Sequence, residues 1–249
     1  MAVKPPWERI IDCCMELSNY VLGYQRLLFP YFVLHDHVHA SNVARYARSL
    51  SALVGATTQA HMAILECSAY LHDCGMALPP RVINRLELTE GEVREDSEEA
   101  LKKLEDVLGG KYPEYFQGGV LRLRSELAPL GYLDALVVRA LHAWLSARFI
   151  ERNLYEWLRE LKVEDELLHQ VTESVAAVVR WHNSNVKLVD NTREVGGYRV
   201  NLGDLARVLR LADAMDFSRS RGRFVYEQLV EDLRENSPSM LKHWVFKMA

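Results

Sequence analysis

The chain has 249 residues, of which 49% are hydrophobic, so it can bury a substantial core, and we expect one large domain over residues 1–249. A formal net charge of −4 at pH 7 argues against a surface for generic nucleic-acid binding, and no segment approaches the roughly 20 uninterrupted apolar residues of a membrane span. Four cysteines are too few for a secreted disulfide scaffold, and the N-terminus has two prolines and charges where a signal peptide needs an apolar run, so we expect a cytoplasmic protein.

The first half of the chain predicts helices of different exposure. Apolar residues recur mostly at intervals of three and four, which indicates a mainly α fold of amphipathic helices packed as a bundle. We expect a helix over 41–54 that Gly55 ends, and a buried central helix over 61–71 that Gly75 and the pair Pro79-Pro80 end. The acidic stretch 87–108 predicts an exposed helix whose inward residues are Leu101, Leu104 and Leu108.

The second half combines two long helices with one small sheet. Segment 109–120 has glycines at both ends around three aromatic residues, which is typical of a surface loop, with a lid over a pocket as the alternative. Long helices are expected over 132–161 and 164–181. Segment 187–200 has the β-branched residues and Gly-Gly of a short hairpin, which would be the only sheet, and a last core helix follows it.

Residues that bind divalent metals fall on the inward faces of different predicted helices. His39 lies four residues before Val43 on a core-facing line, and His142 and His182 continue apolar lines in the same way. Asp213 lies in a helix that is apolar enough to be largely buried. An unpaired carboxylate there would cost several kcal/mol, so this side chain needs a cation.

His72 and Asp73 end the central helix, where side chains about 100° apart can both reach one ion. Each polar residue also has a simpler explanation: a lone inward histidine can be a hydrogen-bonded core residue, Asp213 can pair with Arg210 or Arg219, and the His72-Asp73 pair can merely cap a helix. Their joint occurrence favours a shared cation, because unrelated buried polar residues would each need a partner. A mixed imidazole and carboxylate set suits one or two ions of Mn, Fe, Ni, Co, Zn or Mg.

The order His39, His72-Asp73, Asp213 resembles the H…HD…D pattern of the HD superfamily of metal-dependent phosphohydrolases. HASNVARYA, LHDCGM and LARVLRLADAMDFSRSR are similar to its three ligand segments, and the likeness runs from Phe32 to Arg223. ALHAWLSARFI and VVRWHN resemble the two additional histidine segments of longer HD proteins, which implies His142 and His182 as ligands of a second metal.

The resemblance implies an HD-domain helical bundle that hydrolyses a phosphoester or phosphoanhydride of a nucleotide or a related small molecule. His72 and Asp73 would be the catalytic residues, and the bridging carboxylate would be Asp73. Many HD proteins have a lysine near the substrate phosphate where this chain has Met76, so phosphate contacts must come from elsewhere. Arginines, which grip phosphate with two hydrogen bonds, are the candidates, although each can equally lie on a solvated helix face: Arg148, Arg219, Arg221 and Arg223.

Three nearby residues have supporting roles in this hypothesis. His35 and Asp36 lie one turn before His39 and are candidates to fix its orientation, whereas Glu66 is expected to form a structural salt bridge. Because Met76 replaces the lysine, a regulatory module that binds metal or nucleotide without hydrolysis is a rival interpretation. A di-iron oxygenase and a scaffold with a structural metal or none are the others. The expected partner is a small phosphorylated substrate and not a membrane, and the sequence does not indicate an oligomeric state.

Overall fold

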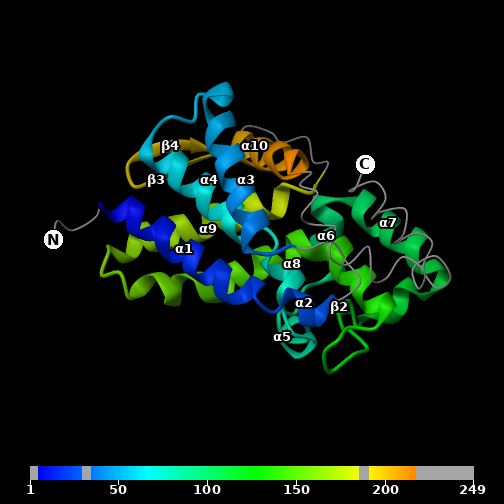
Figure 1. The fold of residues 1–249 in the computed structure, drawn as a ribbon. Helices are drawn as coiled ribbons and strands as arrows, with labels where there is room; N and C mark the ends of the chain where they lie inside the picture. Colours follow the sequence, from blue (N-terminus) through cyan, green and yellow to red (C-terminus); the bar gives the residue numbers. More distant parts are fainter. Residues whose placement is uncertain (1–4, 30–34, 185–190, 217–249) are drawn as a thin grey trace.

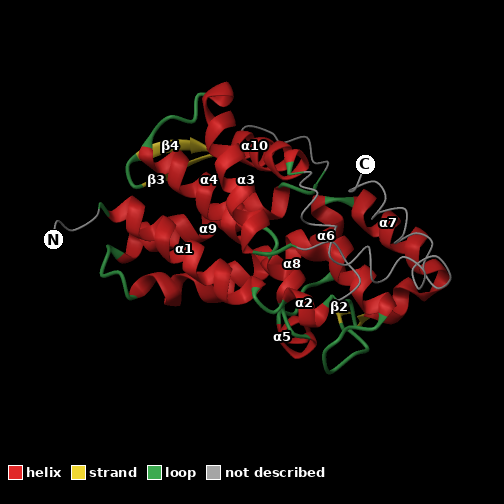
Figure 2. Ribbon diagram, viewed as in Figure 1, coloured by secondary structure: helices red, strands yellow, loops and turns green. Residues whose placement is uncertain are grey.

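The computed structural model describes residues 5–29, 35–184 and 191–216, and it is mainly α-helical, as the periodicity predicts. Figure 1 follows the helices in chain order, and Figure 2 shows how little of the described chain is strand. The helices are α1 (Pro6–Leu22), α2 (Gln25–Leu28), α3 (His37–Leu50), α4 (Gln59–Leu71), α5 (Pro80–Arg85), α6 (Glu90–Asp96), α7 (Glu98–Leu108), α8 (Tyr132–Arg159), α9 (Asp165–Trp181) and α10 (Leu202–Met215), with the 3-10 helices η1 (Ser51–Val54), η2 (Cys74–Ala77) and η3 (Gly109–Tyr115).

Helix α4 lies at the centre of the bundle and packs against α1, α3, α9 and α10. The sequence predicts this helix as buried on nearly every side, and the structure confirms it: Ile64 and Leu65 are both fully buried. Burying each such side chain contributes roughly 1.5–3 kcal/mol relative to leaving it exposed. The Thr58 hydroxyl begins the helix by accepting a hydrogen bond from the backbone N–H of His61. The C-terminal end of α4 is therefore held deep in the molecule.

Gly75 is needed for close packing rather than for ending α4. The helix ends at Leu71, and Gly75 lies in η2, which packs against α8. A Cβ atom on Gly75 would lie 2.6 Å from the carbonyl oxygen of His142 and 2.8 Å from the backbone nitrogen of Ser146. The missing side chain lets α8 approach the end of α4, which places His142 beside Asp73.

The described residues contain two short antiparallel strand pairs, one more than the sequence predicts. The expected hairpin consists of β3 (Thr192–Val195) and β4 (Tyr198–Asn201), joined by two glycines with positive φ. The second pair is β1 (Phe116–Gln117) and β2 (Val120–Leu121), with the same Gly-Gly turn. It forms the end of segment 109–120, which is mostly exposed, as expected of a surface segment, but is folded as η3 and this strand pair instead of an irregular loop. Tyr115 and Phe116 are buried there because they pack into the core.

Two other predicted helices have different bounds in the structure. The helix predicted over 41–54 begins earlier, at His37, and its last turn is the 3-10 helix η1, which ends at Gly55 in the left-handed conformation. The acidic stretch forms α6 and α7 instead of one helix, because Ser97 is extended and its side chain caps α7. The inward orientation of Leu101, Leu104 and Leu108 is confirmed, since all three are buried.

The cysteines and the helices bear on the environment of the protein. All four cysteines are buried and free, so none of them forms a disulfide. Over the described ranges, no helix combines the length and the apolar character that a membrane crossing requires.

Candidate metal centre

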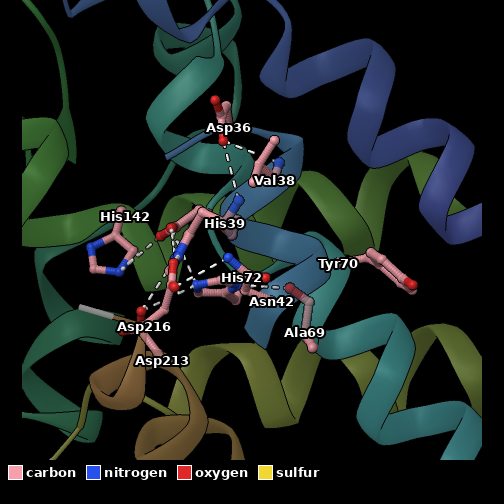
Figure 3. Close-up of polar contacts among 12 residues, drawn as sticks. Asp36, Val38, His39, Asn42, Ala69, Tyr70, His72, His142, Asp213 and Asp216 are labelled. Atoms are coloured by element: carbon pink, nitrogen blue, oxygen red, sulfur yellow. Dashed lines mark hydrogen bonds and ion pairs between the residues drawn. The ribbon is translucent and has the colours of Figure 1, made fainter. Parts of the chain in front are cut away.

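His39 is fixed at both its backbone and its ring. The Asp36 carboxylate caps α3 by accepting hydrogen bonds from the backbone N–H groups of Val38 and His39, each at 3.1 Å. The ring Nδ1 of His39 lies 2.7 Å from Oδ2 of Asp216, whose other oxygen accepts a hydrogen bond from the Asn42 side chain at 3.2 Å (Figure 3). Because a carboxylate accepts the Nδ1 proton, the lone pair of His39 is on Nε2.

His72 and Asp73 meet His39 at the end of α4. Nδ1 of His72 donates a hydrogen bond to the carbonyl oxygen of Ala69 at 2.8 Å, which leaves the lone pair on Nε2. The Oδ2 atom of Asp73 lies 3.2 Å from Nε2 of His72 and 3.2 Å from Nε2 of His39. The other oxygen, Oδ1, lies 3.6 Å from Nε2 of His142. The Asp73 carboxylate therefore faces imidazoles on both sides.

Asp213 approaches the same point from α10. Its Oδ1 atom lies 3.2 Å from Nε2 of His39 and 3.8 Å from Nε2 of His72. His39, His72 and Asp213 each offer a ligand atom within 4.8 Å of the others. Figure 3 shows the three side chains turned toward one another. The Asp213 side chain is 37% exposed, whereas both histidines are fully buried, so the cluster reaches solvent on the α10 side.

His142 and His182 repeat the hydrogen-bond pattern of His72. Each donates from Nδ1 to the carbonyl oxygen three residues earlier, at 2.7 Å for His142 and 2.5 Å for His182, so each presents Nε2 as the acceptor. The His182 ring lies 5.3 Å from the His72 ring and 5.4 Å from the His142 ring, measured between centroids. The structure thus brings together the six residues predicted as metal ligands: His39, His72, Asp73, His142, His182 and Asp213.

The comparison with known families agrees with this geometry. The model of the HD-CE family matches residues 29–249. The chain belongs to the HD-CE family. No curated protein and no solved structure matches it. The likeness to HD proteins that the motifs indicate is therefore confirmed at the level of an HD-like domain. The six predicted metal ligands lie within the matched range.

The histidines and carboxylates of the HD-CE site shift one another's pKa values. Burial disfavours a charged His72, but the carboxylates of Asp73 and Asp213 outweigh burial and raise the pKa of His72 to about 10. Burial likewise opposes a charged Asp73, yet His72, His35 and His39 hold the pKa of Asp73 well below its usual value. Interactions with the imidazoles of His39 and His72 outweigh burial at Asp213 and lower its pKa in the same way. A proton on His72 balances the carboxylates when no cation does.

His182 is prepared to be a neutral ligand. Burial, together with repulsion from the neighbouring His72 and His142, lowers the pKa of His182 to about 3. A metal ligand must be a neutral imidazole, so His182 needs to lose no proton before it binds an ion near pH 7.

The donor set fits a divalent metal. Three of its buried atoms form no hydrogen bond with the described residues: Nε2 of His72, Nε2 of His182 and Oδ2 of Asp73. Buried polar atoms normally have partners, and these atoms point toward one region in which imidazole nitrogens and carboxylate oxygens alternate. A divalent cation would satisfy them together, and the Nδ1 hydrogen bonds are of the kind that orients metal-binding histidines.

The residues predicted to support the ligands differ in how far the structure confirms their roles. His35 stands edge-on to His39 with ring centroids 5.5 Å apart, whereas Asp36 fixes the backbone of α3 and not the His39 ring. Glu66 forms the expected structural salt bridge, with Arg48 at 3.0 Å. Within the described residues, the Arg210 guanidinium donates to backbone carbonyls at the end of α9 rather than to Asp213.

The predicted phosphate-binding residues are not assembled at the site by the described structure. The Arg148 guanidinium contacts the carboxylates of Glu92 and Glu151, the latter at 3.1 Å. Arg219, Arg221 and Arg223 lie outside the described residues. The Met76 side chain is buried, so it does not contact a substrate from the position where many HD proteins have lysine.

Two residues at the site, Asp216 and Asn42, were not predicted from the sequence. Asp216 follows Asp213 by three residues, a spacing that places both near one face at the end of α10, and its N–H bonds the Asp213 carbonyl at 3.2 Å. Asn42 follows His39 by three residues in α3. In both cases the sequence feature that could have identified the residue is its place one helical turn after a predicted ligand.

Proposed function

We propose that this HD-CE protein is a metal-dependent phosphohydrolase that acts on a phosphoester or phosphoanhydride of a nucleotide or related small molecule. The observation that carries the proposal is the two-sided position of Asp73, with Oδ2 toward His39 and His72 and Oδ1 toward His142. A carboxylate in this position is suited to bridge two ions, as in two-metal hydrolases.

The residues divide into two groups around Asp73. His39, His72 and Asp213 would hold a first ion with Asp73, and His142 and His182 would hold a second. When bound, a divalent ion polarises a phosphoryl oxygen and makes water a stronger acid. The donors suit Mn, Fe, Ni, Co, Zn or Mg, and we propose no choice among them.

The protein's own groups set the charge at this site. Asp216 holds the His39 proton on Nδ1 and increases the basicity of Nε2, while His72 must release its proton before it becomes a ligand. The partly exposed edge at Asp213 is where we expect substrate to approach. Phosphate charge would be balanced by Arg219, Arg221 or Arg223, or by Arg148 if phosphate displaces one of its carboxylate partners.

A second candidate is a regulatory HD module that binds metal and nucleotide without hydrolysis. Two observations favour it: Met76 is only 1% exposed, and the Arg148 guanidinium is already bound by two carboxylates. The described residues thus supply metal ligands more completely than phosphate ligands.

Activity assays separate the two candidates. We expect purified protein with Mn, Ni, Co or Mg to turn over at least one member of a phosphoester and nucleotide panel. Asp73→Ala should abolish turnover, because both ion sites lose a ligand. Asp204→Ala is the control, since Asp204 lies on α10 but pairs with Arg207 on the surface. Metal-loaded protein that binds nucleotide and releases no product would favour the regulatory module.

A further inference from the structure

Arg210 joins α10 to the end of α9 through backbone contacts. Its Nε donates a hydrogen bond to the carbonyl oxygen of His182 at 2.6 Å, and its Nη2 donates to the carbonyl oxygens of Trp181, at 3.4 Å, and Ser184. We propose that Arg210 is a positioning residue that holds His182 in place as a ligand of the second metal ion. The proposal rests on the proposed function only where it concerns that ion.

Arg210 adds to the backbone hydrogen bonds that end α9, one of which runs from the Ser184 N–H to the Trp181 carbonyl at 3.1 Å. The last carbonyls of a helix have no intrahelical donor, and many helices satisfy them with a glycine in the left-handed conformation. Here α9 ends at Trp181, and the next residue, His182, keeps the right-handed helical conformation (φ −61°, ψ −26°). A guanidinium offers several donors in one plane and places positive charge at the negative end of the helix dipole. Arg210, on α10, therefore caps the C-terminal end of α9.

The contact restricts the His182 side chain from three directions. The backbone N–H of His182 donates to the Val178 carbonyl at 3.1 Å, its ring Nδ1 donates to the Val179 carbonyl at 2.5 Å, and its own carbonyl accepts from Arg210. Only Arg210 among these partners lies outside α9. Without it, the backbone at His182 is free to change conformation, and the ring can leave the position that faces His72 and His142.

The same contact links the two proposed ion sites. Arg210 precedes Asp213 by three residues on α10, so one turn of helix carries both the residue that holds His182 and a ligand of the first ion. The Asp213 carboxylate faces His39 and His72, whereas the Arg210 guanidinium contacts the carbonyl of His182. Arg210 therefore acts on the site through the α9 backbone.

A metal-free measurement tests the positioning role first. We expect NMR of the 15N-histidine-labelled protein to show His182 as the single Nδ1–H tautomer. Arg210→Ala should give a mixture of tautomers, and Arg210→Lys, which keeps the charge but loses the planar fork, an intermediate result. Arg207→Ala, on the surface of the same helix, is the matched control and should match the wild type. An unchanged His182 signal in folded Arg210→Ala would overturn the proposal.

Calorimetric titration with Mn²⁺ tests the consequence. We expect two equivalents in the wild type, and in Arg210→Ala a second equivalent weakened about tenfold or more, with the first unchanged. In a His182→Ala background, Arg210→Ala should cause no further loss, because the two changes act through one ligand. An equal weakening of both equivalents, or an additive loss in that background, would show a general structural role and contradict the proposal. If the wild type bound no Mn²⁺, the proposed function would fail, and the NMR result would still decide the role of Arg210.

Discussion

The Nδ1 atom of His39 and the Oδ2 atom of Asp216 lie 2.7 Å apart, although the two residues are separated by 177 positions in the chain. The carboxylate is buried, and Asn42 holds its second oxygen. Such a pair fixes the tautomer of a metal-binding histidine and makes its other nitrogen a stronger donor. Asp216 therefore supports the site without being placed among the ligands.

Asp216→Asn tests this support. The amide keeps the shape of the carboxylate but removes its charge, so we expect Mn²⁺ affinity to fall about 10- to 100-fold while the fold is retained. Calorimetric titration measures the affinity, and circular dichroism checks the helix content. Asp204→Asn, a surface change on the same helix, should leave the affinity unchanged. Equal affinity in Asp216→Asn and wild type would refute the role given to this carboxylate.

Gly75→Ala tests the approach of α8 to the end of α4. The new Cβ would overlap the His142 carbonyl and the Leu145 Cβ, the latter at 2.8 Å, so we expect a loss of about 1–3 kcal/mol in the free energy of unfolding. Chemical denaturation measures this loss. Gly110→Ala is the control, because nothing lies within 4 Å of a Cβ there, and it should change stability by less than about 0.5 kcal/mol. A fully stable Gly75→Ala protein with normal metal binding would show that α8 can shift freely.

The raised pKa of His72 predicts how stability depends on pH in the metal-free protein. The folded state holds the His72 proton up to a pKa of about 10, whereas the unfolded state releases it near 6.5. The unfolded state therefore binds fewer protons across this window, and stability falls as pH rises from about 6.5 to about 10. Denaturation at several pH values with and without Mn²⁺ measures the effect, and His72→Gln should flatten the metal-free profile. A metal-free wild type whose stability rises across this window would contradict the coupling of His72 to Asp73 and Asp213.

The cysteines give a prediction for thiol titration. Burial raises the pKa of Cys13 to about 12 and that of Cys14 well above its usual value, so neither is a reactive thiolate near pH 7. We expect very slow reaction with a thiol reagent in the native protein and reaction of all four cysteines after denaturation without reductant. Fewer than four reactive thiols in the denatured protein would indicate a disulfide.

The main features of the fold follow from sequence periodicity. Helices α8 and α9 begin and end within two residues of their predicted bounds, because long amphipathic patterns carry a strong signal. The β1–β2 pair was missed, although its Gly-Gly turn matches that of β3–β4, because its strands are too short to alternate visibly. The break at Ser97 was missed because the acidic pattern continues across it.

Some residues of the candidate site could be predicted from the sequence, and others could not. Residues that continue an inward apolar line, such as His39 and His142, could be placed by helical spacing alone. The role of Asp216 depends on a contact across 177 positions, and that of Arg210 on backbone carbonyls, which a sequence does not display. Gly75 was identified as a helix end, because its contact with α8 is a property of tertiary packing.

Anomalous scattering from crystals grown with Mn²⁺ is the most direct measurement of the central claim. We predict two peaks, one bounded by His39, His72, Asp73 and Asp213 and the other by Asp73, His142 and His182. Fully occupied Mn²⁺ elsewhere in the crystal, with no peak beside Asp73, would contradict the metal centre and the hydrolase function proposed from it.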